Sequence, residues 1–150
     1  MAETARQILT APVSAPPGEP RRLADVPEDR LIELPDGLVG MPHARRFALV
    51  EPTQPGSPFH YLVSVDVPGL GFLVCDPCRF WPGYVSEVSA PAGMEGEVAV
   101  LAIMTMGADG REMTANLMAP LVIDLRSRRG TQLVLDTGRF APRHPLPALG

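Results

Sequence analysis

The sequence contains no lysine, only two cysteines and few aromatic residues, and these shortages exclude several classes of protein. All 13 basic residues are arginines, which reflects codon bias rather than function. Cys75 and Cys78 are too few to build the disulfide framework of a small secreted domain. No apolar run approaches the roughly 20 residues of a membrane-spanning helix, and the N-terminus lacks the apolar segment of a secretory signal. We therefore expect a cytoplasmic protein that does not enter the membrane.

The composition also has little that favours long helices. Its 18 prolines and 14 glycines are spread over the 150 residues and indicate short strands and turns. Residues 1–27 are rich in proline and have no apolar periodicity, which predicts a disordered N-terminal extension. We expect residues 28–150 to form one folded domain, since a hydrophobic fraction of 45% is enough for an ordinary core.

Short apolar segments separated by turn residues predict an all-β domain, a small antiparallel barrel-like or sandwich fold of eight or nine strands. Extended segments are expected at 31–34, 38–41, 46–51, 59–66, 70–75, 84–88, 98–105, 121–125 and 131–135, with one helical turn over 42–46. Segment 98–105 is the longest apolar run and is typical of a central strand buried on both faces. In segment 59–66, Phe59, Tyr61 and Val63 alternate with polar residues, apart from Leu62, as in a half-buried strand.

The stretch Met113–Leu125 organises the rest of the domain. Leu121, Ile123 and Leu125 fall on one face of an expected strand. Pro120 cannot donate a ladder hydrogen bond, so this strand lies at an edge, begins beside Pro120 or contains a bulge. An arginine-rich turn ending in Gly130 leads into the second apolar run, which predicts a hairpin that closes the domain.

No pattern of residues indicates catalysis. Cys75 and Cys78 have the spacing of half a zinc site or of a dithiol, but no second ligand pair completes a zinc site, and a strand-turn context does not suit a dithiol. His43, His60 and His144 are scattered and accompany no nucleophile motif. We therefore expect no enzyme and no cofactor, with a metal or redox protein built on the two cysteines as the lesser alternative.

Charge is distributed unevenly along the chain. Residues 28–112 contain twelve acidic residues and five arginines, a net charge of −7, whereas residues 113–150 contain two acidic residues and five arginines, a net charge of +3. An acidic body disfavours direct nucleic-acid binding and suits either a basic protein partner or a simply solvated surface. The aromatic residues Phe80, Trp81 and Tyr84 are expected to pack in the core rather than to stack on bases.

Several motifs in this order and spacing resemble the flagellar assembly factor FliW family. They are Leu34–Met41, Arg46–Leu49, Ser57–Phe59 with Tyr61–Leu62, Met113–Leu125, Arg128–Asp136 and Arg143–Leu146. The resemblance runs from about Leu31 to Leu146. It departs from the family pattern at Val39, Met41, Asp124 and Phe140, where the family often has Pro, Phe, Asn and Tyr.

The resemblance implies a small β-barrel-like protein without cofactor that binds two proteins inside the cell. One is flagellin and the other is the translational repressor CsrA, whose repression of flagellin mRNA the family antagonises. New flagellin takes the factor away from CsrA, and flagellin secretion releases it again. Neither the membrane nor a small-molecule substrate enters this partner switch. A flagellin-only chaperone remains an alternative.

The expected partner contacts are acidic residues in loops and at strand edges, which would steer a basic partner, together with three residues near the hairpin and the C-terminus. The acidic residues are Glu51, Asp66, Glu95, Glu97 and Asp109, each of which also fits plain solubility. Asn116 either satisfies loop backbone or contacts a partner. Pro145 and Leu146 either contact a partner or pack on the domain.

Overall fold

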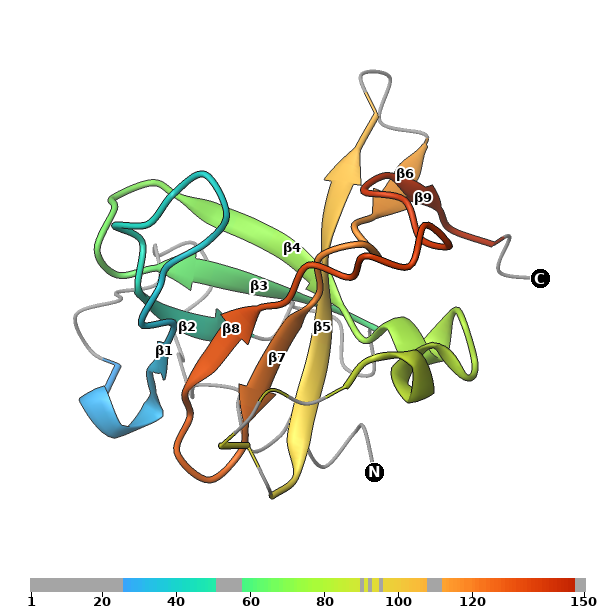
Figure 1. Ribbon diagram of the computed structural model, residues 1–150. Coiled ribbons are helices and arrows are strands. Elements are labelled where there is room, and N and C mark those ends of the chain that lie inside the picture. The colour runs from blue at the N-terminus through green and yellow to red at the C-terminus, as the bar shows by residue number, and fades with distance from the viewer. Residues whose placement is uncertain are drawn as a thin grey trace.

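The computed structural model describes residues 26–50, 58–89, 91, 93–94, 96–107 and 112–147. This part of the chain forms nine antiparallel strands and three short 3-10 helices, which confirms the all-β prediction (Figure 1). In chain order the elements are η2 (Glu28–Arg30), β1 (Ile32–Glu33), β2 (Arg46–Val50), β3 (Phe59–Ser64), β4 (Gly71–Cys75), η3 (Pro77–Arg79), η4 (Tyr84–Glu87), β5 (Val98–Met106), β6 (Met113–Ala115), β7 (Leu121–Asp124), β8 (Gly130–Gln132) and β9 (His144–Pro145). Most of the expected extension, residues 1–25, lies outside the described residues. Among the described residues, no helix is long and apolar enough to cross a membrane.

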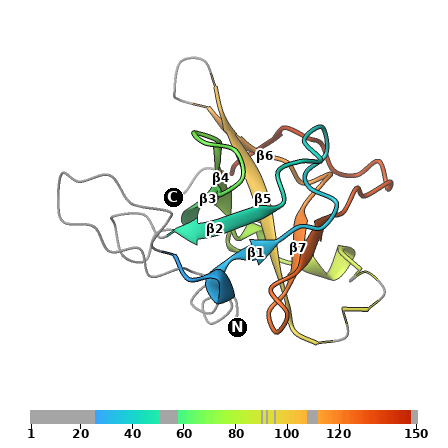
Figure 2. The same ribbon diagram turned by 90° about the vertical axis from the view of Figure 1, so that its left-hand side faces the viewer.

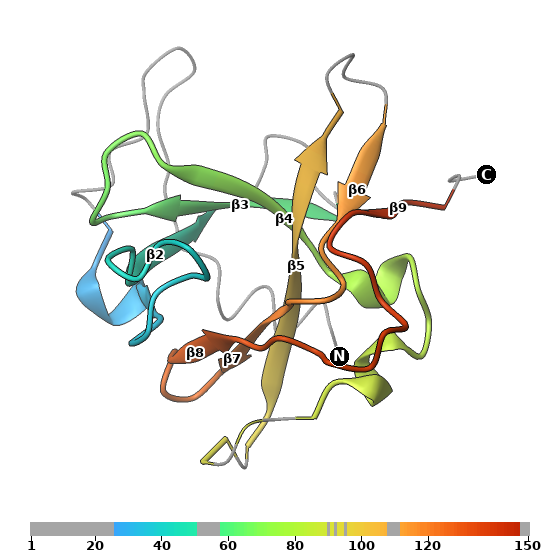
Figure 3. The same ribbon diagram turned by 45° about the horizontal axis from the view of Figure 1, so that its top comes forward.

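Strand β5 is the axis of the sheet, as its apolar run predicts. Strands β1 to β4 follow one another in sequence order, and β4 meets β5 at Ala102 and Ile103. On its other edge β5 pairs first with β7, through residues 98–101, and then with β6, through residues 104–106. Figure 3 shows β5 passing the β3–β4 hairpin in its upper part and the β7–β8 hairpin in its lower part. One strand therefore holds the two halves of the fold together.

The sheet bends toward closure, but its strand ladders do not close into a barrel. The two ends of the bent sheet meet where β1 approaches the β7–β8 turn (Figure 2). A single parallel bridge joins Glu33 to Arg129 there, and the backbone N–H of Glu33 donates to the carbonyl of Arg128 at 2.9 Å. This junction brings together charged residues that are distant in the sequence.

The core fills the inside of this bend. The predicted common face of β7 is confirmed, because Leu121 and Ile123 are fully buried and Leu125 packs against the same cluster. Pro120 directly precedes β7, so the strand begins beside it, as one of the sequence-based alternatives expected. The fully buried side chains of largest volume are Phe47, Ile32, Leu34, Leu49, Leu62, Leu101, Leu117, Leu121, Ile123, Val74 and Val122.

Strand β3 alternates as predicted, but its buried face is the one with more polar residues. His60, Leu62 and Ser64 are buried, whereas Tyr61 is exposed. The register explains this orientation, since Leu62 lies opposite Leu49, which belongs to the core. Phe59, Tyr61 and Val63 therefore lie on the outer face, and Leu62 is the apolar residue of β3 that faces the core.

Two predicted strands are wrong because glycines with positive φ turn the chain. Leu38 and Met41 form a bridge with each other across a tight turn in which Gly40 has a φ of 84°. Segment 84–88 forms η4 instead of a strand, directly after Gly83, whose φ is 90°. In both cases the backbone freedom of glycine decides against an extended segment.

The helical turn expected over residues 42–46 is also wrong. Pro42 and His43 form a turn, Ala44 and Arg45 have no regular structure, and β2 already begins at Arg46. The backbone N–H groups of Arg45 and Arg46 bond to the Asp66 carboxylate, so a side chain from the segment after β3 replaces the helical hydrogen bonds.

Candidate functional site

A charged groove crosses the junction between β1, β2 and the β7–β8 turn. It consists of two adjoining hollows, of about 270 Å³ and about 480 Å³, which share Glu33 and Arg46 in their walls. The smaller hollow is lined by Glu28, Asp29, Leu31, Glu33, Arg46, Ser127, Arg128 and Arg129. The larger one is lined by Glu33, Pro35, His43, Arg45, Arg46 and Asp66. We call this surface the charged groove.

Asp66, one of the predicted contact residues, anchors one end of the charged groove. Its Oδ2 accepts hydrogen bonds from the backbone N–H of Arg45 at 3.0 Å and of Arg46 at 2.8 Å. Its Oδ1 accepts from Arg46 Nε at 2.9 Å and forms an ion pair with Arg46 Nη2 at 2.8 Å. Burial acts to raise the pKa of Asp66, but the hydrogen bonds from Arg46 and Arg45 outweigh it and lower the pKa. The carboxylate therefore holds the start of β2 in place.

We expect Asp66→Asn to destabilise the fold by about 1–2 kcal/mol, because the amide cannot form the charge-assisted bonds to Arg46. The lowered pKa means that the stability contributed by this carboxylate is present above its unfolded pKa and is lost as the pH falls through its folded pKa. Urea unfolding from pH 7 down to pH 2 measures both effects. The variant should lose less stability than the wild type over that range, and an equal loss would contradict this role for Asp66.

The other end of the charged groove is built by the β7–β8 turn. Asp124 Oδ1 accepts hydrogen bonds from the backbone N–H groups of Arg126 and Ser127 at 2.8 and 3.3 Å, which fixes the turn. Arg128 has a φ of 61° and donates from Nε and Nη2 to the carbonyls of Leu31 and Arg30. These contacts tie the turn to the chain that leads into β1.

Glu33 and Arg129 complete this end of the charged groove. Arg129 donates to Glu33 Oε1 from Nη2 at 3.0 Å and from Nε at 3.3 Å. Sequence reasoning does not single out this pair, because 96 positions separate its members. The only local signal is the arginine-rich turn, which does not reveal its partner.

The remaining predicted contact residues do not gather at the charged groove. Asn116, Pro145 and Leu146 lie around β6 and β9, beside the far end of β5 (Figure 1). Glu97 is exposed and directly precedes β5, at its opposite end. Glu51, Glu95 and Asp109 lie outside the described residues. The structure thus distributes the predicted set over three regions of the surface.

Around β6 and β9 the predicted residues take structural positions. Asn116 Oδ1 accepts a hydrogen bond from the backbone N–H of Ala119 at 3.0 Å, which satisfies loop backbone. Leu146 packs against a second apolar cluster, whereas Pro145 is exposed and pairs with Thr114. In this region Pro145 is the predicted residue most available to a partner.

Aromatic side chains fill this second cluster, as expected from the sequence. Phe80 and Tyr84 are buried, and the Tyr84 hydroxyl donates to the carbonyl of Leu117. Burial raises the pKa of Tyr84 to about 12. Trp81 lies edge-on to His144, with ring centroids 5.5 Å apart. The cluster fastens the η3–η4 segment to the C-terminal part of the chain.

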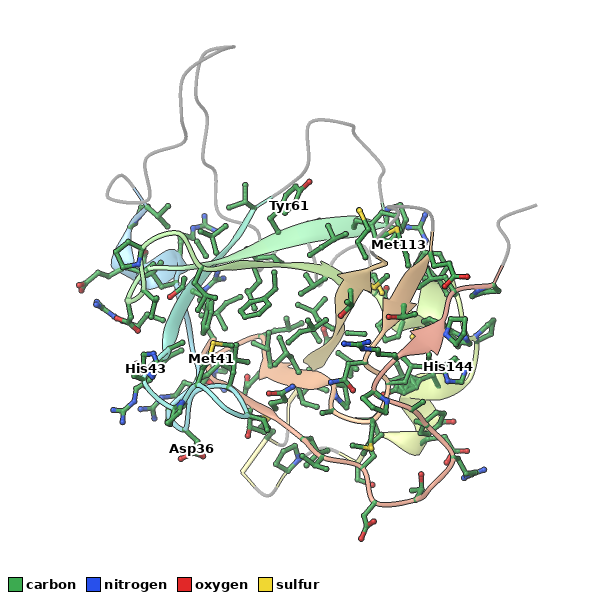
Figure 4. All side chains as sticks on the ribbon, turned by 90° about the horizontal axis from the view of Figure 1, so that it is seen from above. Asp36, Met41, His43, Tyr61, Met113 and His144 are labelled. Carbon is green, nitrogen blue, oxygen red and sulfur yellow. The ribbon has the colours of Figure 1, made fainter. Side chains whose placement is uncertain are left out.

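Neither the cysteines nor the histidines form a recognisable chemical site. Cys75 and Cys78 are free thiols, and burial followed by the nearby Asp76 carboxylate raises the pKa of both, that of Cys75 to about 12. Such thiols are poor nucleophiles at neutral pH. Figure 4 shows His43 and His144 on opposite sides of the molecule. In the described part of the chain, no group of three or more His, Cys, Asp or Glu side chains is placed to hold a metal ion.

Comparisons with known proteins agree on one family. The sequence matches the profile of the FliW protein family over residues 21–146. It is 33% identical over 125 residues to flagellar assembly factor FliW 2 of Desulfotalea psychrophila, covering 79% of this chain and 82% of that protein. It is 35% identical over 119 residues to flagellar assembly factor FliW of Syntrophotalea carbinolica, covering 75% and 84%. A crystal structure of the flagellar assembly factor FliW superposes with a TM-score of 0.70 at 28% identity, covering 83% of this chain and 90% of that one.

Proposed function

The chain belongs to the FliW family of flagellar assembly factors, and on that premise we propose that it binds flagellin and the translational repressor CsrA in competition. Free factor binds CsrA and relieves its repression of flagellin mRNA. Newly made flagellin binds the factor, CsrA is freed, and flagellin synthesis slows until secretion removes flagellin. The observation that carries the proposal is the family match over residues 21–146, which spans the whole β domain.

The charge of the body supports a basic partner. Residues 28–112 have a net charge of −7, and an RNA-binding repressor presents basic residues to its RNA. Charges of opposite sign at the rims of two proteins act mainly on the rate of association and make it depend on salt. We therefore propose that two acidic residues of this body, Glu95 and Glu97, steer CsrA toward its site.

One departure from the family pattern does not favour the flagellin-only alternative. Asp124 stands where the family often has Asn, and its Oδ1 accepts hydrogen bonds from the backbone N–H groups of Arg126 and Ser127. The amide oxygen of Asn can accept the same two bonds. The exchange therefore preserves the β7–β8 turn and gives no reason to remove CsrA from the proposal.

Titration calorimetry with CsrA and with flagellin, each at two salt concentrations, tests the proposed function. Each partner should bind, and addition of flagellin to the CsrA complex should displace CsrA. Binding of flagellin alone would establish the chaperone alternative. Binding of neither would refute the proposal.

Steering by Glu95 and Glu97 has a separate test. We expect the double variant Glu95→Lys, Glu97→Lys to associate with CsrA about tenfold more slowly at low salt, with a weaker salt dependence. Stopped-flow association kinetics measure the rate. The matched control is Glu112→Lys with Asp136→Lys, which makes the same change in net charge at exposed positions elsewhere. Equal slowing in both double variants would mean that overall charge, rather than these two residues, governs association.

A further inference from the structure

The outer face of β2, β3 and β4 is apolar, which is unusual for an antiparallel sheet whose other face already packs on the core. The pairing register places Val50, Tyr61 and Leu73 side by side across the three strands. Ala48 and Val63 form the next row on the same face. No charged residue occurs at these positions, so a second layer of apolar contacts is needed to cover them.

The apolar surface continues onto β5 and β6. Met106 lies opposite Met113 on this face, and Met113 and Leu73 pack against the same aromatic cluster. Tyr61 and Met113 point to the same side of the sheet (Figure 4). The exposed fraction is 48% for Tyr61 and 58% for Met106, so this part of the face is incompletely covered. We call Tyr61, Leu73, Met106 and Met113 the outer strip.

Val26, the first described residue, already lies on the outer face. It is 9% exposed and packs with Ala48 and Val50, which are 0% and 4% exposed although they point away from the core. From Val26 the chain continues through η2 into β1, on the side of β2 opposite β3. Extended backward in the same direction, the chain before Val26 would lie over β3 and β4, where the outer strip lies.

The preceding segment is long enough and apolar enough to reach the outer strip. Adjacent strands are about 4.8 Å apart, so β4 is about 10 Å from β2. Three residues of extended chain span that distance, at about 3.3 Å each. Twenty-five residues precede Val26, and their larger apolar side chains are Met1, Ile8, Leu9, Val13 and Leu23. Leu23, three residues before Val26, is therefore within reach of Tyr61 and Leu73.

We propose that residues 1–25 bind within the molecule to the outer strip, with Leu23 against Tyr61 and Leu73. The outer strip is then an internal docking site for the N-terminal segment. This arrangement and a disordered extension give opposite results in one experiment, because a docked segment is protected from proteases and a disordered one is not.

Limited trypsin digestion of the full chain tests the proposal, since Arg6, Arg21 and Arg22 place cleavage sites inside the segment. Tyr61→Asp should release the segment, and trypsin should then cleave after Arg22 about tenfold faster than in the wild type. Mass spectrometry of the fragments over time measures this rate. Val134→Asp is the matched control, because Val134 has a similar exposed fraction of 54% and lies outside the outer strip. It should be cleaved at the wild-type rate.

Equal cleavage rates in wild type and Tyr61→Asp would overturn the proposal. So would a wild-type dimer in analytical ultracentrifugation that Tyr61→Asp dissociates without faster cleavage, because a second copy would then cover the outer strip. If Tyr61→Asp lowers the thermal midpoint, Met106→Asp repeats the comparison at the more exposed end of the outer strip. Faster cleavage in that variant supports the proposal, and an unchanged rate overturns it.

Discussion

Replacing Gly37 by alanine is expected to destabilise the protein by about 3 kcal/mol, from a left-handed backbone that costs about 1–2 kcal/mol and a steric clash that costs about 1–3 kcal/mol. Gly37 has a φ of 70°, and a Cβ there would lie 2.6 Å from the carbonyl oxygen of Met41 and from the Cα of Pro42. These are backbone atoms of the same hairpin, so they cannot move away as a flexible side chain would. Urea unfolding of both proteins measures the difference.

Gly40 provides the matched control for Gly37. It has a φ of 84° in the same hairpin, but a Cβ there would meet no atom within 4 Å. Gly40→Ala should therefore cost only the left-handed backbone, about 1–2 kcal/mol. If the two variants are equally stable, the close approach of Met41 and Pro42 to Gly37 adds nothing to the free-energy cost of the substitution.

The elements that sequence reasoning predicts well are those whose signals are local. Strand β5 follows from one long apolar run, and the β7–β8 hairpin from two apolar runs around an arginine-rich turn. Gly130 marks the end of this turn for a physical reason, because a Cβ there would lie 2.7 Å from the carbonyl oxygen of Val122. Apolar pattern and turn chemistry agree at these places, so little is left for distant contacts to decide.

The orientation of β3 shows where such reasoning fails. Counting apolar residues favours burial of Phe59, Tyr61 and Val63, yet the strand buries the face with His60 and Ser64. The register with β2 decides the orientation, and the apolar outer face has a second layer of contacts, which begins at Val26. In a sheet with apolar residues on both faces, the alternation along one strand does not show which face lies toward the core.

The charged groove cannot be predicted from the sequence for a different reason. Glu33 and Arg129 meet only because the bent sheet brings β1 to the β7–β8 turn. Asp66 can be named as an acidic residue at the end of an expected strand, but its bonds to Arg45 and Arg46 depend on the β2–β3 register. The sequence shows which residues are charged, whereas only the folded structure shows which of them pair with one another.

Cys75 is expected to be alkylated about a thousandfold more slowly in the folded protein than in the unfolded chain, because the thiolate is the nucleophile. Burial, followed by the charge of Asp76, raises the pKa of this thiol from 9.0 to about 12. At pH 8, raising the pKa by about three lowers the fraction of thiolate about a thousandfold. Iodoacetamide labelling in the absence and presence of urea, followed by mass spectrometry of the peptide, measures the two rates.

The same pKa shift makes stability depend on alkaline pH. A group whose pKa is raised by folding contributes stability that is complete below its unfolded pKa and is lost as the pH rises toward its folded pKa. For Cys75 that interval runs from pH 9.0 to about 12, and the buried Tyr84 hydroxyl, raised from 10.0 to about 12, acts in the same direction. Cys75→Ala should therefore lose less stability between pH 8 and pH 11 than the wild type. Rapid labelling of folded Cys75 at pH 8 would instead reveal an accessible thiolate and revive the redox alternative, whereas slow labelling leaves Cys75 as a packing residue between β4 and η3.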